Sequence, residues 1–140
     1  MKTLLLYSLL ICCVLSACST EKAPESVVIE SPTPAAVIDL APADFAGKSA
    51  QGILIDVRTA AEIAQGKIDG SLAMDYRQGD FEAQIAELPK DREIYLYCAV
   101  GGRSSKAGDL LIAQGFTKVY NLQGGLTAWT EAGLPITMPE

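Results

Sequence analysis

The strongest candidates for chemistry lie together in one short loop, Cys98-Ala99-Val100-Gly101-Gly102-Arg103-Ser104. The loop follows an apolar run that is typical of a buried strand, and a segment with helical spacing follows it. A cysteine at the start of a helix has a lowered pKa, so more of it is the nucleophilic thiolate. Gly101 and Gly102 allow the backbone to turn its N–H groups inward, and Arg103 adds a permanent cation. We therefore expect Cys98 to act as a nucleophile, in a loop that stabilises negative charge on sulfur.

The amino-acid composition narrows the chemistry further. The 140 residues include no histidine, which excludes a Ser-His-Asp triad, a Cys-His dyad and a zinc site with histidine ligands. We expect neither a metal nor a cofactor. The formal net charge of -6 is unsuited to nucleic-acid binding, which requires clustered Lys and Arg, so no nucleic-acid partner is expected.

The elements that must position this loop alternate between strands and helices. Strands are expected at 37–40, 53–57, 71–74, 94–97 and 118–120. Helices are expected from Pro42 to near Gly47, over 81–88 with Asp80 as cap, and over 126–131. Another should begin at a capping box of Thr59 and Glu62 and end near Gly66. A further helix is expected before Gly115, with one face formed by Ala107, Leu110, Leu111 and Gln114. Continuous apolar strands such as 94–97 are typical of a parallel sheet that is buried on both faces. This order predicts an α/β fold in one domain, residues 36–140, with a central parallel sheet of about five strands and helices on both faces.

Four polar residues near the strand ends have expected supporting roles. In open α/β sheets, ligand sites lie at the carboxyl ends of the strands. We expect Asp56 and Arg58 to brace the loops at those ends, mainly as structural residues. Ser104 and Ser105 are expected to cap the helix after the loop, although a hydroxyl there could also reach the sulfur.

Residues 36–136 resemble the rhodanese domain. The matching pieces in chain order are Leu54-Ile55-Asp56-Val57-Arg58, Ala61-Glu62 with Gly66, Ile68-Asp69-Gly70, Cys98 through Ser104, Gly124-Gly125-Leu126-Thr127-Ala128-Trp129 and Gly133-Leu134-Pro135. The resemblance implies a sulfurtransferase in which Cys98 takes the outer sulfur of thiosulfate or of a persulfide. The resulting cysteine persulfide, stabilised by the loop amides, passes its sulfur to a thiol or cyanide acceptor. The implied partners are therefore a small sulfur donor and a thiol acceptor.

Two features of the sequence differ from many members of that family. Lys67-Ile68-Asp69-Gly70 stands where many relatives have His-Ile-Pro-Gly. Ala99 and Val100 also make the loop less polar than loops that favour thiosulfate. These departures leave the physiological sulfur donor open.

Two other functions remain open from the sequence. The domain could be a carrier that receives sulfur from an envelope sulfur-relay partner and has little turnover alone. A phosphatase or arsenate reductase is the third reading. Four residues lie between Cys98 and Arg103, whereas cysteine-dependent phosphatases have five, and the shorter loop favours sulfur transfer.

The first residues have the layout of an export signal. Lys2 precedes an apolar run from Leu4 to Leu15, which is too short for a transmembrane helix. The run ends Leu15-Ser16-Ala17-Cys18, which resembles the bacterial lipoprotein box. That resemblance implies a signal peptide over 1–17 and a lipidated Cys18, followed by a flexible tether to residue 35. We therefore expect a lipid-anchored protein of the bacterial cell envelope, on the outer membrane facing the periplasm. Cys98 would then be the only free thiol of the mature chain.

Overall fold

The computed structural model describes residues 35–139. The expected signal peptide, Cys18 and all but the last residue of the expected tether lie outside this range. The described residues form an α/β domain with five parallel strands in the order β1-β5-β4-β2-β3. The strands are β1 Ile38–Leu40, β2 Ile53–Asp56, β3 Leu72–Ala73, β4 Ile94–Tyr97 and β5 Val119–Leu122. The helices are α1 Pro42–Ser49, α2 Ala60–Ile63, α3 Phe81–Ala86, α4 Gly102–Ala113 and α5 Gly125–Glu131.

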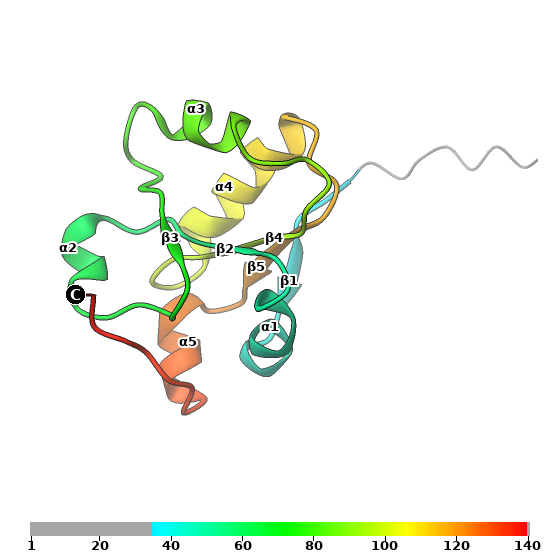
Figure 1. Cartoon of the computed structure of the whole chain (residues 1–140). Helices are drawn as coiled ribbons and strands as arrows, with labels where there is room; N and C mark the ends of the chain where they lie inside the picture. Colours follow the sequence, from blue (N-terminus) through cyan, green and yellow to red (C-terminus); the bar gives the residue numbers. More distant parts are fainter. Residues whose placement is uncertain (1–34, 140) are drawn as a thin grey trace, which may run out of the picture. The chain divides into compact units, whose positions relative to one another are not determined.

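The helices cover both faces of the sheet, as the sequence predicted (Figure 1). Strand β4 lies between β5 and β2 and alternates between the two layers of the core. Ile94 and Leu96 pack in the layer formed with α3 and α4, whereas Tyr95 and Tyr97 pack in the layer formed with α1 and α5. All four residues of β4 are buried. The continuous apolar run is therefore explained by burial on both sides of the sheet.

Several boundaries differ from the sequence prediction. Helix α1 continues to Ser49, two residues beyond Gly47, and α3 ends at Ala86 rather than at residue 88. Asp80 lies at the N-cap of α3, but its side chain makes no capping hydrogen bond. Strand β3 is reduced to two exposed residues at the edge of the sheet, because a strand with a single neighbour gains hydrogen bonds on one side only.

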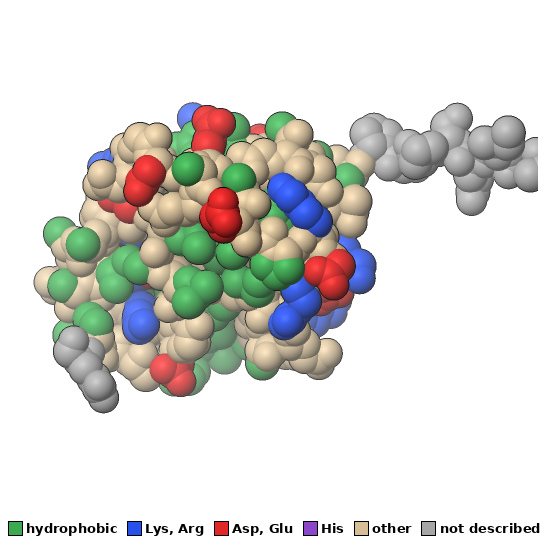
Figure 2. Space-filling model, turned by 45° about the horizontal axis from the view of Figure 1, so that its top comes forward, with side chains coloured by type: hydrophobic (Ala, Val, Ile, Leu, Met, Phe, Trp, Pro, Cys, Tyr) green, Lys and Arg blue, Asp and Glu red, His purple; other side chains and the backbone are tan. Residues whose placement is uncertain are grey.

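Two features of the described residues concern the expected partners: the distribution of surface charge and the length of the apolar helices. On the face shown in Figure 2, Lys and Arg side chains are interspersed with Asp and Glu rather than gathered into one stripe. Among residues 35–139, no helix is long and apolar enough to cross a membrane.

Candidate active site

Cys98 immediately follows β4, at the carboxyl end of the central strand. It is 1% exposed. The chain then turns at Gly101, which has a φ of +94° and forms the N-cap of α4. This left-handed conformation strongly favours glycine, and it directs the Gly101 N–H to the Cys98 Sγ at 3.1 Å. The inward-facing amide that the sequence predicted is therefore present.

Ser104 contacts the same sulfur from the first turn of α4. The expectation that Ser104 and Ser105 cap this helix is wrong, because both serines lie inside α4 and Gly101 holds the N-cap position. The buried Ser104 hydroxyl lies 3.0 Å from the Gly101 carbonyl oxygen and 3.5 Å from the Cys98 Sγ. A helical residue at this position points back over the loop, so the hydroxyl reaches the sulfur instead.

These contacts shift the pKa of the Cys98 thiol. Burial raises the pKa, because it disfavours the charged thiolate. The Ser104 hydroxyl and the amides of Ser104, Val100 and Arg103 oppose this effect by hydrogen bonding to the sulfur. The net result is a pKa below the ordinary value of a cysteine. The loop therefore stabilises a thiolate inside the domain.

The start of α5 holds this loop from behind. The Leu126 N–H donates to the Cys98 carbonyl at 2.8 Å, and the Thr127 N–H donates to the Ala99 carbonyl at 3.0 Å. Gly125 lies so close that a Cβ placed on it would be 2.5 Å from the Cys98 carbonyl oxygen. Because the carbonyl groups of the loop are bound on this side, its amides remain free to face the sulfur.

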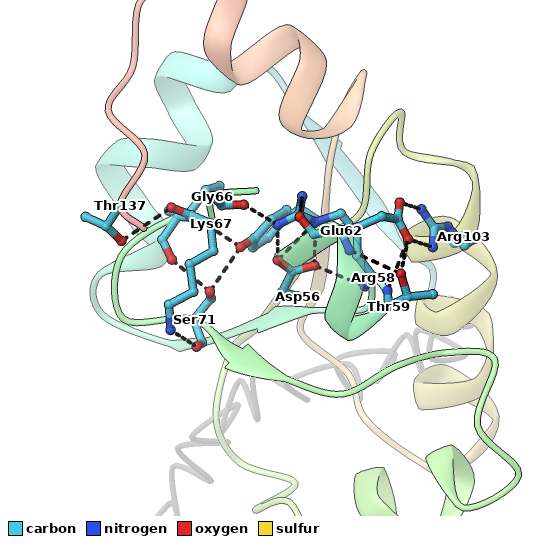
Figure 3. A network of polar contacts seen from close by, with 11 residues as sticks. Asp56, Arg58, Thr59, Glu62, Gly66, Lys67, Ser71, Arg103 and Thr137 are labelled. Carbon is cyan, nitrogen blue, oxygen red and sulfur yellow. Dashed lines mark hydrogen bonds and ion pairs between the residues drawn. The ribbon is translucent and has the colours of Figure 1, made fainter. Parts of the chain in front are cut away.

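Arg103 does not stand in the loop as a separate cation. Its Nη1 donates to Glu62 Oε2 at 2.8 Å, and its Nη2 pairs with Glu62 Oε1. Thr59 donates its backbone N–H and its hydroxyl to the same carboxylate, at 3.1 and 2.8 Å (Figure 3). The Glu62 N–H donates to the Thr59 hydroxyl oxygen at 3.3 Å, which completes the predicted capping box. The hydrogen bond from Arg103 lowers the pKa of Glu62 to about 2, against the effect of burial.

The pairing of Glu62 with Arg103 was not predicted from the sequence, in which Glu62 appeared as a helix cap alone. The two residues are 41 positions apart in the chain. They meet because β2 pairs directly with β4, so the segments that leave the two strands lie side by side. Knowledge that β2 and β4 are neighbouring strands would have been needed to predict this pair.

Asp56 and Arg58 form a buried ion pair at the end of β2. Arg58 Nε lies 2.9 Å from Asp56 Oδ1, and Arg58 Nη2 lies 2.6 Å from Asp56 Oδ2. The same Nη2 donates to the Gly66 carbonyl at 2.8 Å (Figure 3). These contacts tie the end of β2 to the segment after α2. The geometry matches the bracing role that the sequence predicted for Asp56 and Arg58.

Tyr97 provides a second brace, which the apolar strand pattern of 94–97 did not predict. Its buried hydroxyl accepts the Ile68 N–H at 3.0 Å and lies 3.0 Å from Ser71 Oγ. Ser71 donates its own proton to the Ile68 carbonyl at 2.7 Å, so the Tyr97 hydroxyl donates to Ser71. Burial is the main cause that raises the pKa of Tyr97 well above its ordinary value. Tyr97 therefore stays neutral and fixes the turn that includes Lys67-Ile68-Asp69-Gly70.

A small pocket opens beside the loop. Its volume is about 170 Å³. Its lining residues are Arg58, Ala99, Leu126, Thr127 and Thr130. Val100, next to Ala99 in the loop, is 68% exposed. Within residues 35–139, no group of three or more Cys, Asp or Glu side chains is placed to hold a metal ion.

Comparison with known proteins identifies relatives of this domain. The family model of the rhodanese-like domain matches residues 41–132. A sulfurtransferase of Allochromatium vinosum is 44% identical over 88 residues, which cover 63% of this chain and 80% of that protein. A tRNA uridine(34) hydroxylase of Nitrobacter hamburgensis is 37% identical over 110 residues, 74% of this chain; this chain spans 43% of that relative's length.

The fold agrees with a solved structure of the same kind. The crystal structure of a rhodanese-related protein from Thermoplasma volcanium has a TM-score of 0.66 and 25% identity, and the match covers 73% of this chain and 99% of that chain. The domain therefore shares its overall fold with this rhodanese-related protein. The family match, the sequence relatives and this structural likeness together show that the chain belongs to the rhodanese-like domain family.

Proposed function

We propose that this domain is a sulfurtransferase that carries sulfur as a persulfide on Cys98. The observation that carries the proposal is the environment of the Cys98 Sγ, which receives the Gly101 N–H at 3.1 Å and faces the Ser104 hydroxyl at 3.5 Å. Both groups favour negative charge on sulfur. The Ser104 hydroxyl and the amides of Ser104, Val100 and Arg103 keep the pKa of the thiol below its ordinary value despite its burial. The relative that is named a sulfurtransferase supports the same assignment.

The reaction has two steps. The Cys98 thiolate attacks the outer sulfur of the donor and forms a new S–S bond. The bond from that outer sulfur to the donor's inner sulfur breaks, whether the inner sulfur belongs to an alkyl persulfide or to the sulfonate group of thiosulfate. Its electron pair leaves with the remainder of the donor, as a thiolate or as sulfite. A thiol or cyanide acceptor then attacks the outer sulfur of the Cys98 persulfide and restores the thiolate. The loop amides stabilise the negative sulfur between the steps.

The same geometry favours sulfur transfer over phosphate chemistry. Four residues separate Cys98 from Arg103, and both terminal nitrogens of Arg103 are engaged by Glu62. A phosphate group would need several loop amides and this guanidinium around its oxygens. The 1% exposure of Cys98 suits a donor that presents a single terminal sulfur atom.

Intact mass tests the proposed intermediate. Residues 19–140 are purified reduced and weighed before and after incubation with thiosulfate or with a persulfide donor, beside the variant Cys98→Ser. We expect a gain of about 32 Da, the mass of one sulfur atom, that is lost in the variant. No gain with either donor would refute the enzyme and favour the partner-dependent carrier.

We further propose that Cys18 anchors the protein to the cell envelope, with a tether between the lipid and the domain. The support is the lipoprotein-like motif before Cys18; these residues lie outside the described range. Stable anchoring needs more than one acyl chain, since each buried methylene contributes about 0.8 kcal/mol. Labelling of cells with a palmitate analogue should mark the wild-type chain but not Cys18→Ser. An unlabelled wild-type chain in the soluble fraction would contradict the anchor. In the envelope, an external thiol or a sulfur-relay protein would accept the sulfur and keep Cys98 reduced.

A further inference from the structure

Two arginines lie near Cys98: Arg103 belongs to the Cys98–Ser104 loop, and Arg58 lines the pocket beside it. Each is already paired with a carboxylate. Arg58 makes three charged side-chain hydrogen bonds to Asp56, with N–O distances of 2.9, 3.1 and 2.6 Å. Arg103 makes two to Glu62. A cation in contact with a carboxylate attracts a further anion far less than a free cation does, because the opposite charge lies within a few ångströms. The two arginines therefore add little net positive potential at the entrance to Cys98.

Glu62 is itself held so that it cannot release Arg103 without cost. The Thr59 N–H and hydroxyl donate to the carboxylate at 3.1 and 2.8 Å, and the Arg103 and Glu62 side chains are 19% and 33% exposed. An incoming anion that needed the Arg103 guanidinium would have to compete with a preformed, two-point ion pair. Arg103 is thus poorly available to a strongly anionic donor.

The pocket beside the loop has the same character. Ala99 and Leu126 contribute apolar surface, Thr127 and Thr130 come from α5, and Arg58 is the one charged residue of the lining. The Arg58 charge is balanced by Asp56, as described above. The lining therefore suits a small group with an alkyl portion and few charges.

The two classes of sulfur donor differ in charge. Thiosulfate carries two negative charges, and its attack by the Cys98 thiolate releases sulfite, again a dianion. An alkyl persulfide carries at most one negative charge. Attack by Cys98 on its outer sulfur breaks the S–S bond and releases one alkyl thiolate. With the thiolate included, the reacting groups carry three negative charges in the first case and at most two in the second.

We propose that the Glu62–Arg103 ion pair makes Cys98 selective for alkyl persulfides over thiosulfate. The inference rests on the proposed persulfide function and specifies its donor. Glu62 is then a specificity-determining residue, which acts by withholding the Arg103 charge from the donor. It contacts Arg103 and not the sulfur itself.

The test compares single-turnover loading of Cys98 by two donors without an acceptor. The probes are thiosulfate and the persulfide of 2-mercaptoethanol, which has an uncharged alkyl portion. Loading is followed in the full-length protein by mass spectrometry of the tryptic peptide that contains Cys98 and no other cysteine, which spans 93–103 in the wild type and 93–106 where Arg103 is replaced. The rate constants give a selectivity ratio that does not depend on the amount of folded protein.

Glu62→Gln removes the carboxylate charge and keeps the hydrogen bonds of the helix cap, because Gln serves at this position of a capping box. We expect it to raise the ratio of thiosulfate to persulfide loading about tenfold, since Arg103 is released toward the dianion. Adding Arg103→Gln should remove that gain. Glu87→Gln, at the exposed end of α3, changes the net charge equally and should leave the ratio unchanged.

The outcomes separate the two proposals. A wild-type preference for thiosulfate, or a ratio that Glu62→Gln leaves unchanged, would overturn the donor selectivity while Cys98 is still loaded. An equal rise in Glu87→Gln would overturn it as well, because the effect would then be one of net charge. Failure of both donors to load Cys98 would overturn the proposed function, and the donor selectivity with it.

Discussion

The Ser104 hydroxyl lies 3.5 Å from the Cys98 Sγ, while it also lies 3.0 Å from the Gly101 carbonyl oxygen. The buried Ser104 side chain thus links the Cys98 sulfur to the Gly101 turn, whose N–H donates to the same sulfur. The backbone bond from Ser105 N–H to the same carbonyl, at 3.0 Å, continues this turn into α4. The hydroxyl is therefore part of both the loop's shape and its electrostatics.

Removal of this hydroxyl should raise the pKa of the Cys98 thiol. The Ser104 hydroxyl is the first of the groups that lower it, and a hydrogen bond of about 1 kcal/mol corresponds to somewhat less than one pKa unit. We expect Ser104→Ala to slow alkylation of Cys98 by iodoacetamide about three- to tenfold at neutral pH. The pH profile of alkylation measures the shift. Ser105→Ala is the matched control, because the Ser105 hydroxyl is not among the groups that bond the sulfur, and an equal shift there would contradict the assignment.

Substitution of Gly125 should disturb the same loop from the other side. A Cβ at this residue would lie 2.5 Å from the Cys98 carbonyl oxygen, and its φ of +59° disfavours any side chain. We expect Gly125→Ala to destabilise the domain by about 2–4 kcal/mol, measured by urea denaturation. Gly47→Ala is the control, because a Cβ there meets nothing within 4 Å, and Ala in a helix should be neutral or stabilising by up to about 1 kcal/mol. Equal stability of the two variants would show that the close approach at Gly125 is tolerated.

The buried Asp56–Arg58 pair should be costly to break from one side. Asp56 is 0% and Arg58 4% exposed, so removal of the carboxylate leaves a buried cation without its partner. We expect Asp56→Ala to lower the free energy of unfolding by about 3–5 kcal/mol, and the double variant Asp56→Ala with Arg58→Met to lose less. Thermal unfolding measures both, and exposed Asp109→Ala on α4 should stay within about 0.5 kcal/mol of wild type. A double variant less stable than Asp56→Ala would contradict this account.

The lowered pKa of Glu62 predicts a specific pH dependence of stability. Its folded pKa is about 2 and its ordinary value is 4.5. The unfolded chain therefore takes up the proton first, so the stabilisation is complete above about pH 4.5 and is lost as pH falls toward 2. We expect a comparison of unfolding at pH 6 and pH 3 to show a smaller acid loss in Glu62→Gln than in wild type. The effect will be modest, because the pair is partly exposed and screened. An identical acid loss in Glu62→Gln would contradict the pairing with Arg103.

The fold class was largely predictable from local patterns. Apolar runs such as 94–97 indicated buried strands, and Thr59 with Glu62 indicated a helix start that the structure confirms. The errors fall where neighbours decide the outcome. Strand β3 has two residues, whereas the apolar pattern predicted a strand over 71–74. Gly101 is the N-cap of α4, a position that was expected of Ser104.

The sequence by itself determined which residues could carry the chemistry. A cysteine after a buried strand, two glycines, an arginine and a serine before a helix specify the loop, because strand, turn and helix signals are local. The absence of histidine limited the mechanisms in the same way. The tertiary structure alone decided that Glu62 neutralises Arg103, that Tyr97 holds the Ile68 turn and that Gly125 supports the loop. These contacts join segments up to 41 residues apart, and they depend on which strands are neighbours in the sheet, which no local pattern of residues specifies.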